Sequence, residues 1–160
     1  MDNKGKILWA DDEIELLKPH ILFLKKKGFI VNAVNSGEDA LSLLKSERFD
    51  IVLLDEMMTG LDGLTTLRLI KVDHPNIPVV MITKNEDEWL MDEALGQQIS
   101  NYLTKPVNPS QVLLACKSIL EKTKLQYDHT AKSYLNEFNN ISLDVNEAFQ
   151  YSDWYAIYDK

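Results

Sequence analysis

Residues 51–63 read IVLLDEMMTGLDG, and this stretch decides the fold. Its four consecutive apolar residues, Ile51 to Leu54, are typical of a strand buried on both faces, as in a parallel sheet. An acid, Asp55, follows this run directly. A carboxylate at the end of a buried strand is costly unless a cation or hydrogen-bond donors meet it. The stretch therefore predicts a parallel sheet and a partner for Asp55.

Similar apolar runs recur along the chain and alternate with segments whose apolar residues lie three or four positions apart. In one such segment Ala40, Leu43 and Leu44 share a helical face, and Ser36 precedes it as a predicted helix cap. Five strands alternating with five helices predict an α/β fold, a doubly wound parallel sheet with helices on both faces. We expect strands at 7–10, 29–34, 51–54, 78–83 and 99–103, and helices at 14–27, 37–47, 62–73, 87–95 and 109–121.

Polar residues follow four of the five predicted strands. Asp11 and Asp12 follow the first, Asp55 ends the third, Thr83 ends the fourth and Lys105 follows the fifth. The carboxyl ends of parallel strands meet at one edge, where such sheets bind their ligands. Carboxylates that converge there repel each other unless a hard cation such as Mg²⁺ neutralises them. We therefore expect Asp55 to meet a divalent cation, held with Asp11 and Asp12, and the ammonium group of Lys105.

This set of residues suits phosphoryl chemistry. A carboxylate can attack phosphorus to form an aspartyl phosphate, and an ammonium group and a hydroxyl can stabilise phosphoryl oxygens. Other phosphate chemistries fit less well: no glycine-rich phosphate loop occurs, and Met57 stands where a D-x-D phosphohydrolase needs its second acid. Each residue alone could be a helix cap or a surface charge, but their order on four strand ends favours one shared site.

The composition is that of an ordinary globular protein, with 45% hydrophobic residues among 160. Seventeen basic and 25 acidic side chains give a net charge of −8, which disfavours a nucleic-acid-binding surface. The single cysteine, Cys116, allows no internal disulfide and lies among apolar residues, as expected of a core thiol. No run approaches the about 18 apolar residues of a membrane span, and no signal peptide precedes the first strand. We expect a cytoplasmic protein that does not enter a membrane.

The acidic pair after ILWA, the segment LLDEMMTGLDG, the threonine after VVMI and the segment NYLTKP resemble the receiver domain of two-component response regulators. The resemblance covers residues 5 to about 122, and we place a receiver domain at 1–122. It implies a flavodoxin-like sheet of strand order 2-1-3-4-5. It also implies a phosphoacceptor, not an enzyme, with at most slow self-dephosphorylation. The phosphoryl donor would be a phosphohistidine on a sensor histidine kinase.

The resemblance assigns a role to each acid. Asp55 would be the phosphorylation site. Asp12 and Asp55 would ligate Mg²⁺ directly, together with the backbone carbonyl of Met57, and Asp11 would act through a bound water.

The resemblance also implies a switch. Lys105 would pair with the phosphoryl group, while the Thr83 hydroxyl moves to the phosphate and the Tyr102 ring turns inward. Two residues depart from the family pattern: Thr59 stands where most receivers have proline, and Lys84 stands where a small residue is usual. These departures put reactivity towards small phosphodonors in doubt. The alternative is a receiver-like interaction module that takes no phosphate and recognises partners through its fourth helix, fifth strand and fifth helix.

Residues 123–160 are predicted to form a helical extension, the start of a truncated helical bundle. They contain no Gly or Pro, and their apolar residues from Tyr127 to Ala148 are spaced alternately four and three apart. This stripe predicts either a homodimer, through the helix at 123–150, or packing inside the bundle; the face of the fourth helix, fifth strand and fifth helix is a second dimer surface. Ser152 would cap a further helix. The segment resembles that of PorX-type regulators, in which an alkaline-phosphatase-like domain follows, so we expect the chain to be a fragment.

Overall fold

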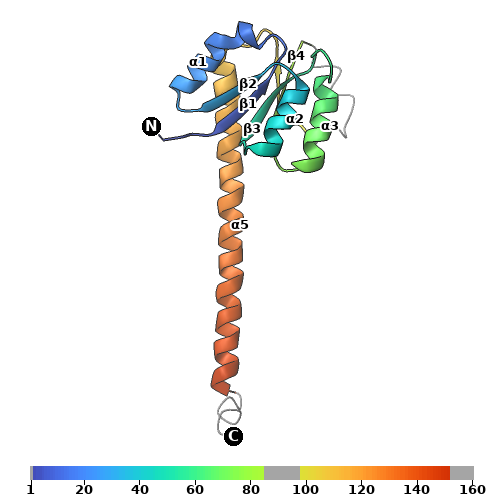
Figure 1. Ribbon diagram of the computed structural model, residues 1–160. Coiled ribbons are helices and arrows are strands. Elements are labelled where there is room, and N and C mark those ends of the chain that lie inside the picture. Colours follow the sequence, from blue (N-terminus) through green and yellow to red (C-terminus); the bar gives the residue numbers. More distant parts are fainter. Residues whose placement is uncertain (1, 85–97, 152–160) are drawn as a thin grey trace. The chain divides into compact units, whose positions relative to one another are not determined.

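The computed structural model describes residues 2–84 and 98–151, and the side chains up to residue 140. Within these residues, five parallel strands form one sheet in the order β2-β1-β3-β4-β5, which confirms the predicted doubly wound fold (Figure 1). The strands are β1 (Lys6–Ala10), β2 (Ile30–Val34), β3 (Ile51–Asp55), β4 (Val79–Thr83) and β5 (Asn101–Thr104). The helices are η1 (Ile14–Leu17), α1 (Lys18–Lys26), α2 (Gly37–Ser46), α3 (Gly63–Asp73) and α5 (Pro109–Tyr151).

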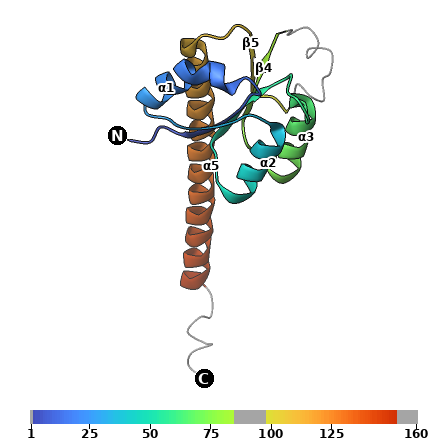
Figure 2. The same ribbon diagram turned by 45° about the horizontal axis from the view of Figure 1, so that its top comes forward.

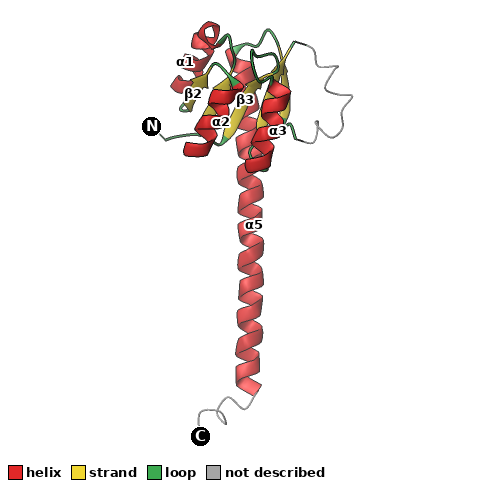
Figure 3. Cartoon of the chain, turned by 45° about the vertical axis from the view of Figure 1, so that its right-hand side comes forward, coloured by secondary structure: helices red, strands yellow, loops and turns green. Residues whose placement is uncertain are grey.

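Helices cover both faces of the sheet. Helices α2 and α3 lie on one face, and α1 and the beginning of α5 lie on the other (Figures 2 and 3). Because side chains alternate along a strand, Leu8 and Leu54 enter the core beneath α2 and α3, while Trp9 and Leu53 enter the opposite core. Every residue of β3 and β4 is buried, as their continuous apolar runs predict. Cys116 is buried in the second core, and burial raises its pKa to about 12.

Side-chain caps fix where two of the helices begin. Asp39 donates its backbone N–H to the Ser36 hydroxyl over 3.1 Å, so the predicted cap of α2 is confirmed. Asp62 accepts the backbone N–H of Thr65 over 2.7 Å and caps α3; this hydrogen bond lowers the pKa of Asp62. The start of α3, which follows Asp55 in the chain, is thereby fixed.

The helix predicted at 14–27 is wrong in its first turn. Residues Ile14–Leu17 form a 3₁₀ helix, and the α-helix begins only at Lys18. Proline has no backbone N–H and is tolerated in the first turn of an α-helix, so Pro19 places the start of α1 just before itself. The helix predicted at 87–95 lies outside the described residues.

The predicted end of the fifth helix at residue 121 is also wrong. Helix α5 is continuous from Pro109 to Tyr151, because no proline or glycine follows Pro109 to interrupt it. The chain divides into two compact units, Met1–Leu120 and Glu121–Lys160. The helix predicted after Ser152 lies outside the described residues. None of the helices in the described ranges is long and apolar enough to cross a membrane.

Candidate functional site

The parallel sheet brings the predicted site residues to one edge. Asp11 and Asp12 directly follow β1, Asp55 ends β3, Thr83 ends β4 and Lys105 directly follows β5. Strand register aligns these ends, because β1 pairs with β3, β3 with β4, and β4 with β5. All five residues predicted from the strand ends are therefore neighbours at the carboxyl edge of the sheet.

The three acids form a cluster. One carboxylate oxygen from each of Asp11, Asp12 and Asp55 lies within 4.8 Å of the other two. Asp11 and Asp55 are each only 2% exposed, whereas Asp12 faces solvent. The backbone N–H of Glu13 donates to Asp11 Oδ1 over 2.8 Å and fixes that carboxylate. Three oxygen donors of like charge at this spacing could hold a hard divalent cation such as Mg²⁺.

Lys105 is the partner that the buried acid requires. Its Nζ lies 2.8 Å from Asp55 Oδ1 and 3.7 Å from Asp11 Oδ2. Burial raises the pKa of Asp55 to about 6 and the Asp11 charge adds to this, while Lys105 and the Met57 N–H partly offset it. Burial alone would lower the pKa of Lys105, but the neighbouring carboxylates raise it overall. The backbone N–H of Lys105 donates to the Thr83 carbonyl over 2.8 Å, which positions the ammonium group at this edge.

The loop between β3 and α3 packs tightly around the acids. A Cβ on Gly63 would lie 2.3 Å from the carbonyl oxygen of Asp55, so only glycine fits there. The N–H of Gly63 donates to the Glu56 carbonyl over 2.8 Å. Thr59 points its N–H and its hydroxyl at Asp12 Oδ2, over 3.3 and 3.4 Å. Proline, which most receiver domains have at this position, has neither a backbone N–H nor a hydroxyl to donate.

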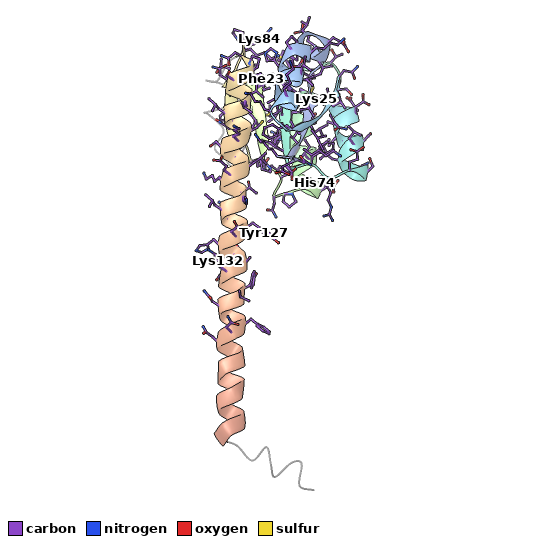
Figure 4. The ribbon with its side chains drawn as sticks, turned by 90° about the vertical axis from the view of Figure 1, so that its left-hand side faces the viewer. Phe23, Lys25, His74, Lys84, Tyr127 and Lys132 are labelled. Atoms are coloured by element: carbon purple, nitrogen blue, oxygen red, sulfur yellow. The ribbon has the colours of Figure 1, made fainter. Side chains whose placement is uncertain are left out.

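The predicted switch residues lie on the adjacent strands β4 and β5. Thr83 is buried on β4, and Tyr102, on β5, is half-buried with its side chain packed against the core beneath α2 and α3. Lys84 is exposed at the carboxyl edge, while His74 lies at the opposite edge of the sheet (Figure 4). The side chain of Met57 is 70% exposed. A cavity of about 510 Å³ covers the site; its lining includes Asp12, Glu13, Asp55, Glu56, Lys84 and Lys105.

One site residue was missed in the sequence. The Thr83 hydroxyl donates a hydrogen bond to the carboxylate of Glu56, and Glu56 lines the same cavity as Asp55. Residue types alone do not indicate this contact, because it depends on the register between β3 and β4. Asp55, the last residue of β3, pairs with Ile82 in the parallel ladder, so the residues that follow these two, Glu56 and Thr83, are neighbours.

Comparison with known proteins agrees with this geometry. The family model of the response regulator receiver domain matches residues 7–117. The response regulator MprA of Mycobacterium ulcerans is 30% identical over 139 residues, which are 87% of this chain and 60% of MprA. A transcriptional regulatory protein of Haemophilus influenzae, the CpxR homolog, is 33% identical over 141 residues, 87% of this chain and 60% of that protein. The chain thus spans about 60% of the length of these two relatives.

Solved structures show the same architecture. The receiver domain of NtrX from Brucella abortus is 28% identical, with a TM-score of 0.65 over 72% of this chain and 98% of that chain. The receiver domain of the Francisella response regulator 1452 is 24% identical, with a TM-score of 0.67 over 74% of this chain and 98% of that chain. The second likeness supports the fold alone.

Proposed function

Because this chain belongs to the response regulator receiver family, we propose that it accepts a phosphoryl group onto Asp55 from a phosphohistidine of a sensor histidine kinase. The observation that carries the proposal is the environment of this carboxylate. Asp55 is buried at a strand end, it clusters with two other acids, and its Oδ1 lies 2.8 Å from Lys105 Nζ. A carboxylate so placed combines a nucleophile, a cation site and a group that stabilises phosphoryl oxygens.

The acidic cluster supports the Mg²⁺ that this proposal requires. Asp12 and Asp55 would hold the ion directly with the backbone carbonyl of Met57, and Asp11 would hold it through a water. All of these donors are oxygens, and Mg²⁺ prefers one or two carboxylates together with waters and phosphate oxygens. When bound, the ion would neutralise the charge of the carboxylates and of the incoming phosphoryl group.

The transfer exchanges one bond to phosphorus for another. A carboxylate oxygen of Asp55 attacks the phosphorus, a P–O bond forms, and the P–N bond to histidine breaks with its electron pair left on nitrogen. Lys105 neutralises charge on the phosphoryl oxygens, and Thr83 donates its hydroxyl proton to one of them while the Tyr102 ring turns inward.

In the slow return step, the oxygen of a water attacks phosphorus. The P–O bond to Asp55 then breaks, inorganic phosphate leaves, and the carboxylate is restored. Hydrolysis requires a water aligned with the phosphorus. Met57 offers only a weak sulfur acceptor to orient such a water, which supports slow self-dephosphorylation.

The face beside Lys105 supports docking of the kinase. Leu16 on η1 is 72% exposed and Leu22 on α1 is 54% exposed, so both offer apolar surface to a partner. A cavity of about 600 Å³ adjoins Leu16; its lining includes Trp9, Leu16, Leu17, Lys105, Pro106 and Val107. An amphipathic helix that carries the phosphohistidine would cover these residues and bring phosphorus to Asp55.

The proposal also covers the helical unit, Glu121–Lys160, and the domain through which the protein would act after phosphorylation. We propose a receiver domain at 1–122 and a helical extension at 123–160. Because the extension resembles that of PorX-type regulators, we also propose that an alkaline-phosphatase-like domain belongs to the full protein. Self-association through the apolar stripe of the extension, or through the face of the fourth helix, β5 and α5, would be the response to phosphorylation. A cytoplasmic location suits a partner kinase that presents its phosphohistidine there.

The test is the substitution Asp55→Asn. With Mg²⁺ and phosphoramidate, or with a phosphorylated kinase, the wild-type chain should gain the mass of one phosphoryl group, and hydroxylamine should remove it as expected of an acyl phosphate. Asp55→Asn should gain none. Asp73→Asn, the same chemical change at an exposed carboxylate at the end of α3, should behave as wild type. Labelling of the Asp55→Asn variant would refute the assignment. Lack of labelling of the wild type by any donor would favour the interaction module that takes no phosphate.

A further inference from the structure

Two backbone hydrogen bonds position Glu56 beside Thr83. Its backbone N–H donates to the carbonyl of Ile82 over 3.0 Å, and its carbonyl accepts the N–H of Gly63 over 2.8 Å. The side chain of Glu56 is half-buried, and its carboxylate accepts a hydrogen bond from the Thr83 hydroxyl. Thr83 itself is only 1% exposed. The hydrogen bond thus joins two positions that β3 and β4 fix side by side.

This hydrogen bond conflicts with the role proposed for Thr83. A hydroxyl has one proton to donate. In the structure that proton is directed at Glu56, whereas a phosphoryl group on Asp55 would need it for one of its own oxygens. The conflict is also electrostatic, because a phosphoryl group adds negative charge to a cavity that Glu56 lines. Thr83 cannot serve both anions with one proton.

We propose that Glu56 is a positioning residue that holds the Thr83 hydroxyl while Asp55 is unphosphorylated and releases it when the phosphoryl group arrives. The inference rests on the proposed function and adds a residue to its switch. The hydrogen bond stabilises the unphosphorylated arrangement, so the phosphoryl group must displace Glu56 before Thr83 can reach it. Removing the Glu56 carboxylate should therefore favour the arrangement with Thr83 turned towards Asp55.

The first experiment measures the affinity for beryllofluoride, an analogue of the phosphoryl group, by calorimetry on the full chain at saturating Mg²⁺. Glu56→Ala should bind it about tenfold more tightly than wild type, the size expected of one lost competing hydrogen bond to a charged group. Glu56→Gln keeps an acceptor oxygen without the charge, and its affinity should lie between the two.

Two controls separate the loss of the hydrogen bond from the loss of one negative charge near the bound beryllofluoride. Glu13→Ala removes an acid from the rim of the same cavity, on the loop between β1 and η1, and should give only a small gain in affinity. In a Thr83→Val background, the effect of Glu56→Ala should fall to that of Glu13→Ala, because no hydroxyl remains to be held. Non-additivity of this kind isolates the contact between Glu56 and Thr83.

The second experiment observes the hydrogen bond without any ligand. Three-bond couplings to the Thr83 methyl group report its χ1 rotamer, which should be single in wild type and in Glu13→Ala and averaged in Glu56→Ala. Equal affinity gains from Glu56→Ala and Glu13→Ala, or an unchanged Thr83 rotamer, would overturn the inference while wild-type binding of beryllofluoride left the proposed function standing. A wild type that bound no beryllofluoride would overturn the proposed function and the inference together.

Discussion

The two compact units of the chain expose their apolar side chains to very different degrees. In Met1–Leu120 the sheet and its helices bury two continuous cores, and the site lies at the edge between them. In Glu121–Lys160 every described side chain, from 121 to 140, is exposed, including large ones such as Leu135 and Phe138. Both units contain helices with apolar stripes, so the stripe alone does not determine burial. What differs, among the described residues, is whether a second element covers the stripe.

The largest difference should appear on truncating a leucine in each unit. Leu67 on α3 is fully buried, and Leu67→Ala should lower the free energy of unfolding by about 2–5 kcal/mol. Leu135 on α5 is 59% exposed, and Leu135→Ala should change it by no more than about 0.5 kcal/mol. Urea unfolding followed by circular dichroism measures both at a low protein concentration. A loss of several kcal/mol from Leu135→Ala would show that another element covers the helical unit.

An intermediate effect is expected at Asp55. Burial and the Asp11 charge raise its pKa from the ordinary 3.8 to about 6, so its ionisation costs more in the folded chain than in the unfolded one. Stability is therefore lost as the pH rises from about 4 through 6. Without metal, Asp55→Asn should exceed wild type in unfolding free energy by about 1–3 kcal/mol at pH 7.5, and the gain should vanish near pH 4.

The control for this measurement lies in the helical unit. Asp128 is exposed, and Asp128→Asn should leave the free energy of unfolding within about 0.5 kcal/mol of wild type at both pH values. Equal responses of the two variants to pH would show that burial does not govern the charge of Asp55. A gain from Asp55→Asn that persisted at low pH would assign the effect to packing.

Much of the unit Met1–Leu120 could be predicted, because short apolar runs followed by polar residues identify its strands. Four apolar residues followed by an acid identified β3, and parallel topology then implied that Asp11, Asp55 and Lys105 would share an edge. The two helix boundaries that were wrong depend on where proline and glycine occur in the chain. Pro19 set the start of α1, and the absence of any proline or glycine after Pro109 joined two predicted helices into α5.

The contact of Glu56 with Thr83 could not be predicted from residue types, because an acid after a strand is ordinary on a surface. It depends on register: a slip of one residue between β3 and β4 would separate the pair. Likewise, nothing in the type of residue 59 indicates that its N–H and hydroxyl would reach Asp12. Contacts between residues on different strands or loops can be identified only in the three-dimensional structure. Residues at strand ends can be identified from the sequence.

The smallest expected effect concerns association of the helical unit. Tyr127, Tyr134 and Phe138 are 66–74% exposed along one stripe of α5, and Figure 4 labels Tyr127 on this helix. A second copy of the chain would cover the stripe, so we expect the mass from light scattering to rise from monomer towards dimer with concentration. Phe138→Asp places a charge in the stripe and should keep the chain monomeric.

Asn136→Asp adds the same charge at a position outside the stripe, so it should associate as wild type does and serves as the matched control. Aromatic residues are untypical of a tight two-stranded coiled coil, so the dimer should be weak, and the comparison needs protein concentrations up to about 1 mM, the range of weak association. Beryllofluoride with Mg²⁺ should strengthen association of the wild type if phosphorylation drives it, and should not rescue Phe138→Asp. A wild-type chain that stayed monomeric throughout, with or without beryllofluoride, would exclude the stripe as a dimer surface and favour its packing inside a helical bundle.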